Sequence, residues 1–302
     1  MTTEIAKYLA QFRGQEVTYL PNPGNAGDSV IAAGTYHAMD AAGLRYVTPH
    51  RDRLDPTGRV VFYGGGGNLV GDTTHSARTI AAVHAKAKHL TILPHTVKDV
   101  DGLLGEFGGN VTVICRERVS YDHVRSRGGR YETLLMDDMA FSLDVERLLG
   151  DRDAFNLPAM LWDFVQKQVR RDRAHANFDS VMRYLWPGRE AGRVLTRKPG
   201  GTLHCFRLDD EAGGMPIPPD NIDLSQVFAF GVSPPAVAFH AARCMIRVVK
   251  ACDQVDTDRL HVAVSSAIAG TTIRFFPNSY YKCRAVWEFS MKDRFPNVIW
   301  MG

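Results

Sequence analysis

An arginine and a histidine stand two residues apart at the start of a predicted helix. The stretch Asp-Thr-Asp-Arg259-Leu-His261 precedes an apolar run that ends at Gly270, and aspartate, threonine and glycine are typical of helix ends. Because a helix N-terminus has unpaired N–H groups and positive partial charge, an arginine there predicts a site for a small, multiply charged anion. The alternative is a capped helix with a surface arginine and a packed histidine.

Two glycine-rich stretches follow predicted strands in the first half of the chain. Residues 22–29 (Asn-Pro-Gly-Asn-Ala-Gly-Asp-Ser) open a predicted helix, and residues 64–67 are four consecutive glycines followed by Asn68. Neither stretch has the dinucleotide-binding or the Walker pattern. A tight turn needs only one or two glycines, so the second stretch predicts close approach of another group to the backbone. Asp28 either caps its helix or serves a sugar ligand through a hydrogen bond or a proton transfer.

A histidine and an arginine come directly after two other predicted strands. His95 follows the strand at 89–93, and Arg116 follows the strand at 110–115. Ligands of open α/β sheets bind beyond the carboxyl ends of the strands. His95 is therefore either a base that faces a cleft or a structural hydrogen-bonding residue. Arg116 either binds an anion or forms a surface ion pair with Glu117.

Two groups in the second half of the chain follow the same rule. Arg207 comes after a predicted strand and is suited to bind a carboxylate or a phosphate, while Asp209 or Glu211 accepts sugar hydroxyls or handles protons. The alternative for this segment is an ordinary polar loop. Lys282 lies beyond the strand predicted at 272–276 and either adds positive charge to the same cleft or is solvated.

Short apolar runs rich in β-branched residues alternate with helical stretches along the chain. This alternation predicts parallel strands that are covered by helices on both faces. The first half has predicted strands at 17–20, 59–63, 89–93 and 110–115, further apolar runs at 134–136 and 139–143, and helices at 29–42, 73–88 and 119–127. The second half has predicted strands at 202–206, 254–255 and 272–276, and helices at 234–250 and 259–270. The expected fold class is α/β, with two Rossmann-like domains that face a cleft.

Length and composition are those of a globular protein of two domains. The chain has 302 residues, of which 45% are hydrophobic and 23% are charged. We expect a Rossmann-like domain over 1–150, a basic helical connector over 151–200 and a second Rossmann-like domain over 201–302. The net charge of +3 is too small to indicate nucleic-acid binding, and the five scattered cysteines form no CxxC pair. No transmembrane run or signal core is found, so we expect a cytoplasmic protein with reduced thiols.

The predicted connector is strongly basic. Residues 167–198 contain nine lysines and arginines and three aspartates and glutamates, which leaves a charge near +6. One interpretation is a solvated helical connector. The other is contact with an anionic partner, such as a membrane surface or a pyrophosphate-linked acceptor.

Taken together, these features resemble those of the polysaccharide pyruvyl transferase family. They occur in family order between residues 18 and 290: Gly-Asn-Ala-Gly-Asp at 24–28, glycines at 64–67, Leu-Pro at 93–94, Arg-Glu and a later Ser at 116–120, Asp-Met-Ala-Phe at 138–141, Arg-Leu-Asp at 207–209, Thr-Asp-Arg-Leu-His at 257–261, and Lys282. The chain departs from the family pattern at His95, where glutamine is common, and at Met139, where proline is common.

The resemblance implies the arrangement of two Rossmann-like domains called GT-B. It also implies transfer of a pyruvyl group from phosphoenolpyruvate to a sugar diol of a cell-surface polysaccharide or exopolysaccharide precursor, with release of phosphate. Phosphoenolpyruvate is then a co-substrate, and neither a cofactor nor a metal is expected. The acceptor is a sugar or a lipid-linked oligosaccharide, and a lipid-linked acceptor would bring the protein to the inner face of the membrane.

The resemblance assigns anion binding to Arg259, to the backbone of Leu260 and to His261, with Arg116 as a second arginine. The expected donor-binding residues are Gly65, Gly66, Gly67, Asn68, Arg116, Arg207, Arg259, Leu260, His261 and Lys282. The expected catalytic residues are His261, Asp28 and Asp209, and those expected to face the acceptor are Asn25, Asp28 and His95. Two other functions share these features: a GT-B glycosyltransferase that uses a nucleotide sugar, and a non-catalytic carbohydrate-binding protein.

Overall fold

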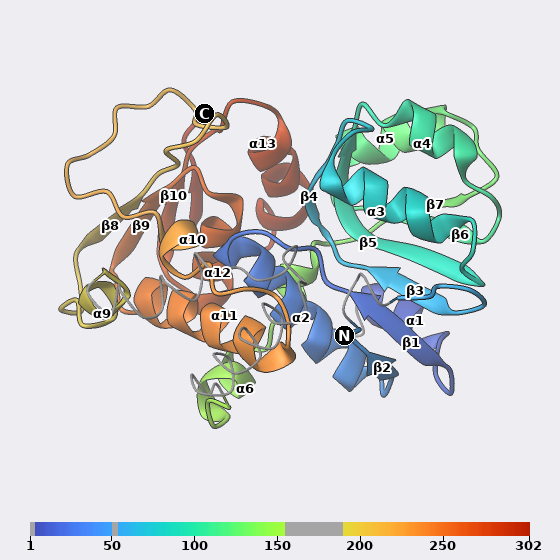
Figure 1. Cartoon of the computed structure of the whole chain (residues 1–302). Coiled ribbons are helices and arrows are strands. Elements are labelled where there is room, and N and C mark those ends of the chain that lie inside the picture. Colours follow the sequence, from blue (N-terminus) through green and yellow to red (C-terminus); the bar gives the residue numbers. More distant parts are fainter. Residues whose placement is uncertain (1–3, 50–53, 155–189) are drawn as a thin grey trace, which may run out of the picture. The chain divides into compact units, whose positions relative to one another are not determined.

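The computed structural model describes residues 4–49, 54–154 and 190–302, which form two compact units (Figure 1). Unit 1 comprises Met1–Asn22, Ile31–Asp144 and Tyr280–Pro296, and unit 2 comprises Pro23–Val30, Val145–Ser279 and Asn297–Gly302. Each unit is therefore built from separate stretches of the chain. The expected domains, in contrast, were continuous, with Pro23–Val30 in the first and Tyr280–Pro296 in the last.

Unit 1 contains a parallel sheet of seven strands. They are β1 (Glu16–Leu20), β2 (Arg45–Val47), β3 (Val60–Tyr63), β4 (Gly66–Val70), β5 (His89–Lys98), β6 (Val111–Cys115) and β7 (Glu132–Leu135). The strand order is β2-β1-β3-β5-β6-β7, and β4 pairs with the second half of the long strand β5. All of these pairs are parallel, which confirms the α/β fold with parallel sheets expected from the sequence.

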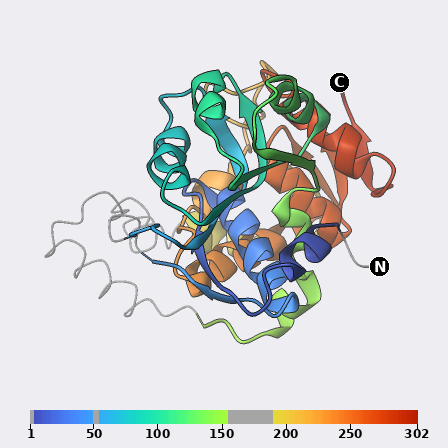
Figure 2. The ribbon, with the colours of Figure 1, turned by 90° about the vertical axis from the view of Figure 1, so that its right-hand side faces the viewer.

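Helices cover both faces of this sheet (Figure 2). The helices of unit 1 are α1 (Glu4–Ala10), α2 (Ala26–Ala41), α3 (His75–His84), α4 (Asp101–Glu106), α5 (Arg118–Ser126) and α13 (Lys282–Val286), with the short turns η2 (Met139–Ser142) and η3 (Trp287–Met291). On one face, α1 and α2 pack on the sheet through ring contacts such as Phe12 on Phe62 and Tyr36 on Tyr19. On the other face lie α3, α4 and α5.

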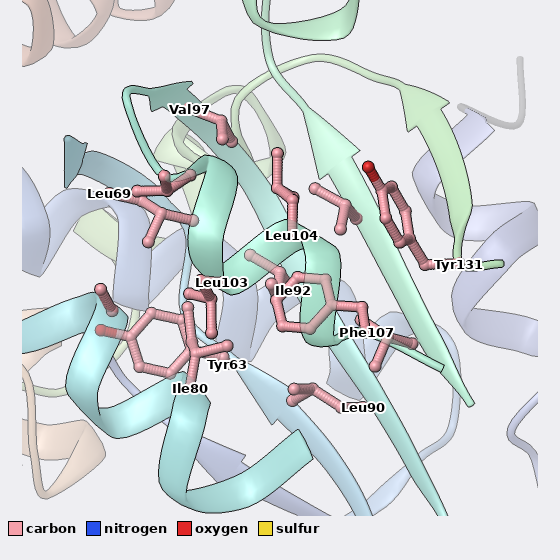
Figure 3. Close-up of a cluster of buried hydrophobic side chains, with 14 of the residues drawn as sticks. Tyr63, Leu69, Ile80, Leu90, Ile92, Val97, Leu103, Leu104, Phe107 and Tyr131 are labelled. Atoms are coloured by element: carbon pink, nitrogen blue, oxygen red, sulfur yellow. The ribbon is translucent and has the colours of Figure 1, made fainter. Parts of the chain in front are cut away.

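The second face holds a large apolar core, drawn in Figure 3. Ile80 of α3 and Leu104 of α4 pack there with Leu90 and Ile92 of β5 and with Val113 of β6. Alternate residues of a strand point to opposite faces, and both faces of this sheet are covered by helices. The strands therefore read as continuous apolar runs in the sequence, which is why their positions could be predicted.

Two elements of unit 1 differ from the sequence-based expectation. The apolar run at 139–143 is not a strand, because Asp138 caps a 3₁₀ helix over Met139–Ser142 through its hydrogen bond from the Ala140 N–H. The glycine run was expected to be a loop, but Gly66 and Gly67 begin strand β4. Glycine is unfavourable in a strand interior, so strand propensity gave no sign of β4.

Unit 2 contains a smaller parallel sheet of four strands. They are β8 (Thr202–Cys205), β9 (Gln254–Thr257), β10 (Thr272–Phe275) and β11 (Val298–Trp300), in the order β11-β10-β9-β8. Its helices are α6 (Val145–Gly150), α9 (Glu190–Leu195), α10 (Leu224–Val227), α11 (Pro235–Lys250) and α12 (Leu260–Ala269). Helix α12 ends where the sequence indicated, at Gly270, which takes the left-handed conformation with a φ of 81°.

In the part of the chain that the structure describes, no helix combines the length and the apolar character needed to cross a membrane. The basic segment predicted over 167–198 lies largely outside the described residues, which resume at Glu190. Of that segment, Arg197 is described, and its guanidinium donates to the Thr202 carbonyl 2.7 Å away.

Candidate functional site

The strand order of unit 1 reverses between β1 and β3. The chain moves from β1 outward to β2, then returns to the other side of β1 to place β3. In open parallel sheets, the carboxyl ends of the two strands at such a reversal form a crevice for ligands. Here these ends are followed by Asn22 and by Gly64, whose N–H donates to the Leu20 carbonyl over 2.8 Å.

The glycines of residues 64–67 are needed because other parts of the protein lie against them. A Cβ at Gly64 would stand 2.5 Å from the Asn22 nitrogen, and one at Gly65 would stand 2.6 Å from the Pro94 carbonyl oxygen. Gly66 has a φ of 151°, which favours glycine. The predicted close approach is thus confirmed, but the approaching groups belong to the protein itself.

A buried network of polar side chains surrounds the end of β3. The Tyr63 hydroxyl oxygen lies 3.0 Å from Asn22 Oδ1 and 2.9 Å from Ser76 Oγ, and Ser76 donates to Asn68 over 2.7 Å. The Asn22 amide donates to Asn68 Oδ1 over 2.7 Å, and His95 Nε2 lies 3.2 Å from the same oxygen. Because buried polar groups are costly when unpaired, this mutual pairing fixes the backbone between β3 and β4.

His95 is held as a neutral ring. Its side chain is 0% exposed, and burial, together with the nearby positive charge of Arg116, lowers its pKa from 6.5 to about 3. A fully buried ring that bonds to Asn68 fits the structural role better than a role as a base that faces a cleft. Glutamine, which is common here in the resembling family, is also neutral and can make the same hydrogen bond.

Replacing His95 by glutamine is expected to reduce the loss of stability on acidification. In the unfolded chain His95 binds a proton below pH 6.5, whereas in the folded protein it does so only near pH 3. The contribution of His95 to stability is therefore complete above pH 6.5 and falls as the pH drops below that value. Between pH 7 and 5 the His95 contribution to this loss is about 2 kcal/mol. Urea unfolding of both proteins at the two pH values measures the difference. Equal losses in the two proteins would contradict the buried neutral histidine.

Arg116 lies at the carboxyl end of β6 in a fully buried ion pair. Its Nη1 donates to Asp138 Oδ2 over 2.7 Å and its Nε to Thr96 Oγ1 over 2.9 Å, and both ionic side chains are 1% exposed. The alternative of a surface ion pair with Glu117 is wrong, because Glu117 is buried and caps α5 by accepting from the Ser120 N–H over 2.9 Å. Arg116 therefore has a structural role in unit 1, because it balances the buried charge of Asp138.

Lys282 lies beside Arg116, with Gly67 next to both. A Cβ at Gly67 would stand 2.6 Å from Arg116 Nη2 and 3.3 Å from Lys282 Cδ. Lys282 is 6% exposed, and its Nζ lies 4.9 Å from the centre of the Tyr280 ring. The alternative of a solvated lysine is thus wrong. The structure gathers Gly67, Arg116 and Lys282 in unit 1.

No family model matches this chain, and no curated protein sequence matches it. A solved structure is similar along its whole length. It is an uncharacterized protein from Klebsiella pneumoniae subsp. pneumoniae, with 26% sequence identity, a TM-score of 0.74 and complete coverage of both chains. The likeness supports a Rossmann-like α/β fold for this chain.

The second group of predicted residues lies at the carboxyl ends of β8 and β9 in unit 2. These strands are paired, with Cys205 opposite Thr257, so the residues that follow them are neighbours. Arg259 stands directly before α12 and is 3% exposed, which excludes a surface arginine. Its N–H donates to Thr257 Oγ1 over 2.9 Å.

Arg259, the N-cap residue of α12, makes no side-chain capping bond. The two aspartates expected to cap the helix are used elsewhere. Asp256 accepts from Arg274 Nε over 2.8 Å, and Asp258 accepts from the Arg207 N–H over 2.8 Å. The N-terminus of α12 consequently keeps the character of an anion site, with Arg259 and the backbone of Leu260 at its start.

Arg207 and Arg259 are surrounded by carboxylates. Arg207 binds Asp209 through two hydrogen bonds, of 2.7 and 3.1 Å, and its Nη1 lies 2.8 Å from Glu211. Arg259 pairs with Asp209 and with Asp223. Burial raises the pKa of Asp209, but the hydrogen bonds of Arg207 and the charge of Arg259 outweigh it, so the pKa lies below its ordinary value. Asp209 is thus an ionised partner of the arginines and a weak base.

The glycine loop at residues 24–28 meets α12 within unit 2. Asn25 caps α2 by accepting from the Gly27 N–H over 2.8 Å, and Asp28 accepts from the Asn25 N–H over 2.8 Å. This reciprocal pair is a capping box, so Asp28 has the capping role that was one of its two alternatives. A Cβ at Gly27 would stand 2.9 Å from His261 Nδ1, which places His261 against the first turn of α2.

The predicted site residues thus fall into two groups, one in each unit. Unit 1 holds the glycines at 65–67 with Asn68, His95, Arg116 and Lys282, and unit 2 holds Asn25, Asp28, Arg207, Asp209, Arg259, Leu260 and His261. No functional role was predicted for Asp138 or Asp223, the carboxylates that hold Arg116 and Arg259. Asp138 follows the strand next to Arg116, and that adjacency could have indicated the pair.

A Cys–His–Asp arrangement on α11 does not form a nucleophile. Cys244 Sγ lies 3.7 Å from His240 Nε2, and His240 Nδ1 lies 2.7 Å from Asp153 Oδ2. Burial and the charge of Asp153 raise the pKa of the Cys244 thiol to about 12, so the reactive thiolate is not formed near neutrality. Within residues 4–49, 54–154 and 190–302, no three His, Cys, Asp or Glu side chains are grouped to hold a metal ion.

Proposed function

We propose that this protein is a pyruvyltransferase of the polysaccharide pyruvyl transferase type. It moves the pyruvyl group of phosphoenolpyruvate onto a diol of a sugar in a cell-surface polysaccharide or exopolysaccharide precursor and releases phosphate. The observation that carries the proposal is Arg259, a buried arginine at the uncapped N-terminus of α12. A guanidinium at a helix N-terminus matches a carboxylate and a phosphate on one small molecule.

The neighbours of Arg259 fit the same donor. His261 is the second residue of α12 and lies against Gly27 at the start of α2, so the N-termini of two helices meet there. Both helix dipoles favour negative charge at that point. Arg207, at the end of the adjacent strand, supplies a second guanidinium. In unit 1, Arg116 and Lys282 meet at Gly67 and form a second group of positive charge.

The reaction needs one proton at carbon and two hydroxyl groups. The methylene carbon of phosphoenolpyruvate takes a proton, one sugar hydroxyl attacks the central carbon, and the carbon–oxygen bond to phosphate breaks. The second hydroxyl then closes the ketal. Of the two hydroxyl protons released, one balances the proton taken by the methylene carbon and the other leaves with phosphate.

In this reaction the arginines stabilise charge on the donor and His261 exchanges protons. Guanidinium groups fixed before the reaction stabilise the departing phosphate without reorganisation. His261 is the histidine at the two helix N-termini, so it is suited to general acid–base work. Asp209 and Asp28 are less suited to that work than expected, because one is paired with two arginines and the other closes the capping box. Asn25 belongs to the same capping box, so it would contact the acceptor through its side-chain nitrogen and not through the oxygen that caps α2.

The proposed place of action is the cytoplasm, at the inner face of the membrane if the acceptor is lipid-linked. Calorimetric titration with phosphoenolpyruvate, beside UDP, tests the proposed donor. Saturable heat with phosphoenolpyruvate, and phosphate release when an acceptor sugar is added, are the expected results. Heat with UDP alone would instead support a glycosyltransferase that uses a nucleotide sugar, and silence from both would leave a carbohydrate-binding protein.

A further inference from the structure

Arg259 has two carboxylate partners that differ in how firmly they are held. Asp223 accepts a hydrogen bond from Arg259 Nη2. Asp209 lies 3.0 Å from Nη1, but this contact lacks hydrogen-bond geometry, and Nε and Nη1 are both buried without a hydrogen-bond partner in the described part of the chain. A buried guanidinium with two unused donors is costly and indicates a missing acceptor.

Asp223 is fixed on both sides. Its side chain is 7% exposed, and its Oδ1 caps α10 by accepting from the Ser225 N–H over 3.1 Å. The residues on either side are tied to β8, since the Ile222 N–H donates to the His204 carbonyl over 2.9 Å and the Leu224 N–H to Cys205 Sγ over 3.3 Å. The Asp223 carboxylate therefore cannot leave Arg259 without disturbing α10.

Asp209 is held mainly by its own loop. Its side chain is 42% exposed, and its hydrogen-bond donors are Arg207, two residues before it, and the Glu211 N–H, two residues after it. The adjacent Leu208 is 70% exposed, so this loop has little apolar packing. A small change in the loop can move Asp209 away from Arg259 at low cost.

The charge balance requires one carboxylate to leave when an anion binds. The cluster already carries a net charge of −1, from the two positive groups Arg207 and Arg259 and the three negative groups Asp209, Glu211 and Asp223. Adding a phosphate or carboxylate to this buried cluster would raise the repulsion strongly, because charges interact more strongly away from water. Departure of the exposed Asp209 removes that repulsion and also loosens Arg207, which becomes a second cation for the anion.

We propose that Asp223 is the positioning residue that orients Arg259. Asp209 occupies the anion-binding position until the anionic group of the substrate displaces it. The identity of that substrate as phosphoenolpyruvate rests on the proposed function, but the exchange itself concerns any small phosphate or carboxylate. Asp223 stays bound to Nη2, and the incoming anion takes Nε and Nη1.

Binding of inorganic phosphate and of phosphoenolpyruvate to three isosteric variants tests this inference. Asp209→Asn removes the competing charge and should lower the Kd for both anions about 5-fold. Asp223→Asn retains an oxygen that can cap α10, so it should fold, but it loosens Arg259 and should raise Kd about 10-fold. The matched control Asp220→Asn changes an exposed carboxylate of unit 2 that pairs with His204 rather than with Arg207 or Arg259, and it should change Kd less than 2-fold.

A second measurement separates positioning from a general structural role. In an Arg259→Lys background, Asp223→Asn should have no further effect on Kd if Asp223 acts through the fork of Arg259, whereas a structural defect would add to the loss. The inference is overturned if Asp209→Asn binds phosphate no better than the wild type, including the case in which neither binds, or if the Asp223 effect persists in that background. A different outcome is that phosphate follows the expected pattern of Kd values while phosphoenolpyruvate binds no more tightly than phosphate and is not turned over. In that case the positioning inference stands and the proposed function fails.

Discussion

Replacement of Arg259 by alanine is expected to abolish measurable binding of phosphoenolpyruvate. Arg259 is 3% exposed and stands at the start of α12, so its guanidinium is the buried positive charge proposed to hold the donor there. Loss of one partner of a buried, hydrogen-bonded charge pair costs about 2–5 kcal/mol, which raises Kd roughly 30- to 5,000-fold. Calorimetric titration gives Kd, and phosphate release with an acceptor sugar gives kcat/KM.

Two control variants make the Arg259 result specific. Arg259→Lys keeps the charge but loses the two-pronged donor geometry, so we expect an intermediate loss of about 10-fold. Arg284→Ala removes an exposed arginine of α13 that pairs with Glu288, and its Kd should equal that of the wild type. If Arg259→Ala binds within 3-fold of the wild type and remains folded, the donor does not bind at α12, and the proposed function loses its main support.

The alanine variant also leaves a carboxylate without its cation. Asp223 is 7% exposed and would remain beside the vacated position, which disfavours its ionised form. Thermal unfolding of Arg259→Ala should therefore occur at lower temperature than that of Arg259→Lys. Measuring binding well below both unfolding temperatures separates lost affinity from lost structure.

Much of the fold could be predicted because buried parallel strands appear in the sequence as continuous apolar runs. The strands at 17–20, 59–63 and 110–115 correspond to β1, β3 and β6 within one residue or so at each end. Strand β5 is longer than predicted, since it continues through Pro94, and β4 was missed because glycines begin it. Local propensity cannot indicate a strand that forms because its neighbour β5 extends to pair with it.

The candidate site could be predicted in its parts but not in its pairing. The rule that polar residues after parallel strands gather at one sheet edge correctly placed Arg207 near Arg259, and Gly67 near Arg116. It could not show that Asp209 would turn back on Arg207 and Arg259, because that depends on the path of a loop. Nor could it assign residues to the two units, because residues 280–296 return to unit 1 after three strands of unit 2.

Separating Arg116 from Asp138 is expected to cost more stability than any other single ionic change considered for unit 1. Both side chains are 1% exposed, and removal of one charge leaves the other buried without compensation. Arg116→Met should therefore lower the free energy of unfolding by about 3–5 kcal/mol. Asp138→Asn keeps the oxygen that accepts from the Ala140 N–H. We expect it to lower the free energy of unfolding by a similar amount, and this loss would reflect the missing charge and not a missing cap.

The double variant Arg116→Met/Asp138→Asn reveals how the pair works. With neither charge present, the penalty of an unpaired buried ion disappears, so the double variant should be more stable than either single variant in urea unfolding. The exposed pair Arg284–Glu288 is the matched control, and its loss should cost less than about 1 kcal/mol. Additive costs at Arg116 and Asp138 would contradict a coupled buried pair.

The double variant also tests whether Arg116 binds the donor, because this variant should be folded. Unchanged affinity for phosphoenolpyruvate means that Arg116 is purely structural. A loss of affinity means that Arg116 also binds the donor beside Lys282.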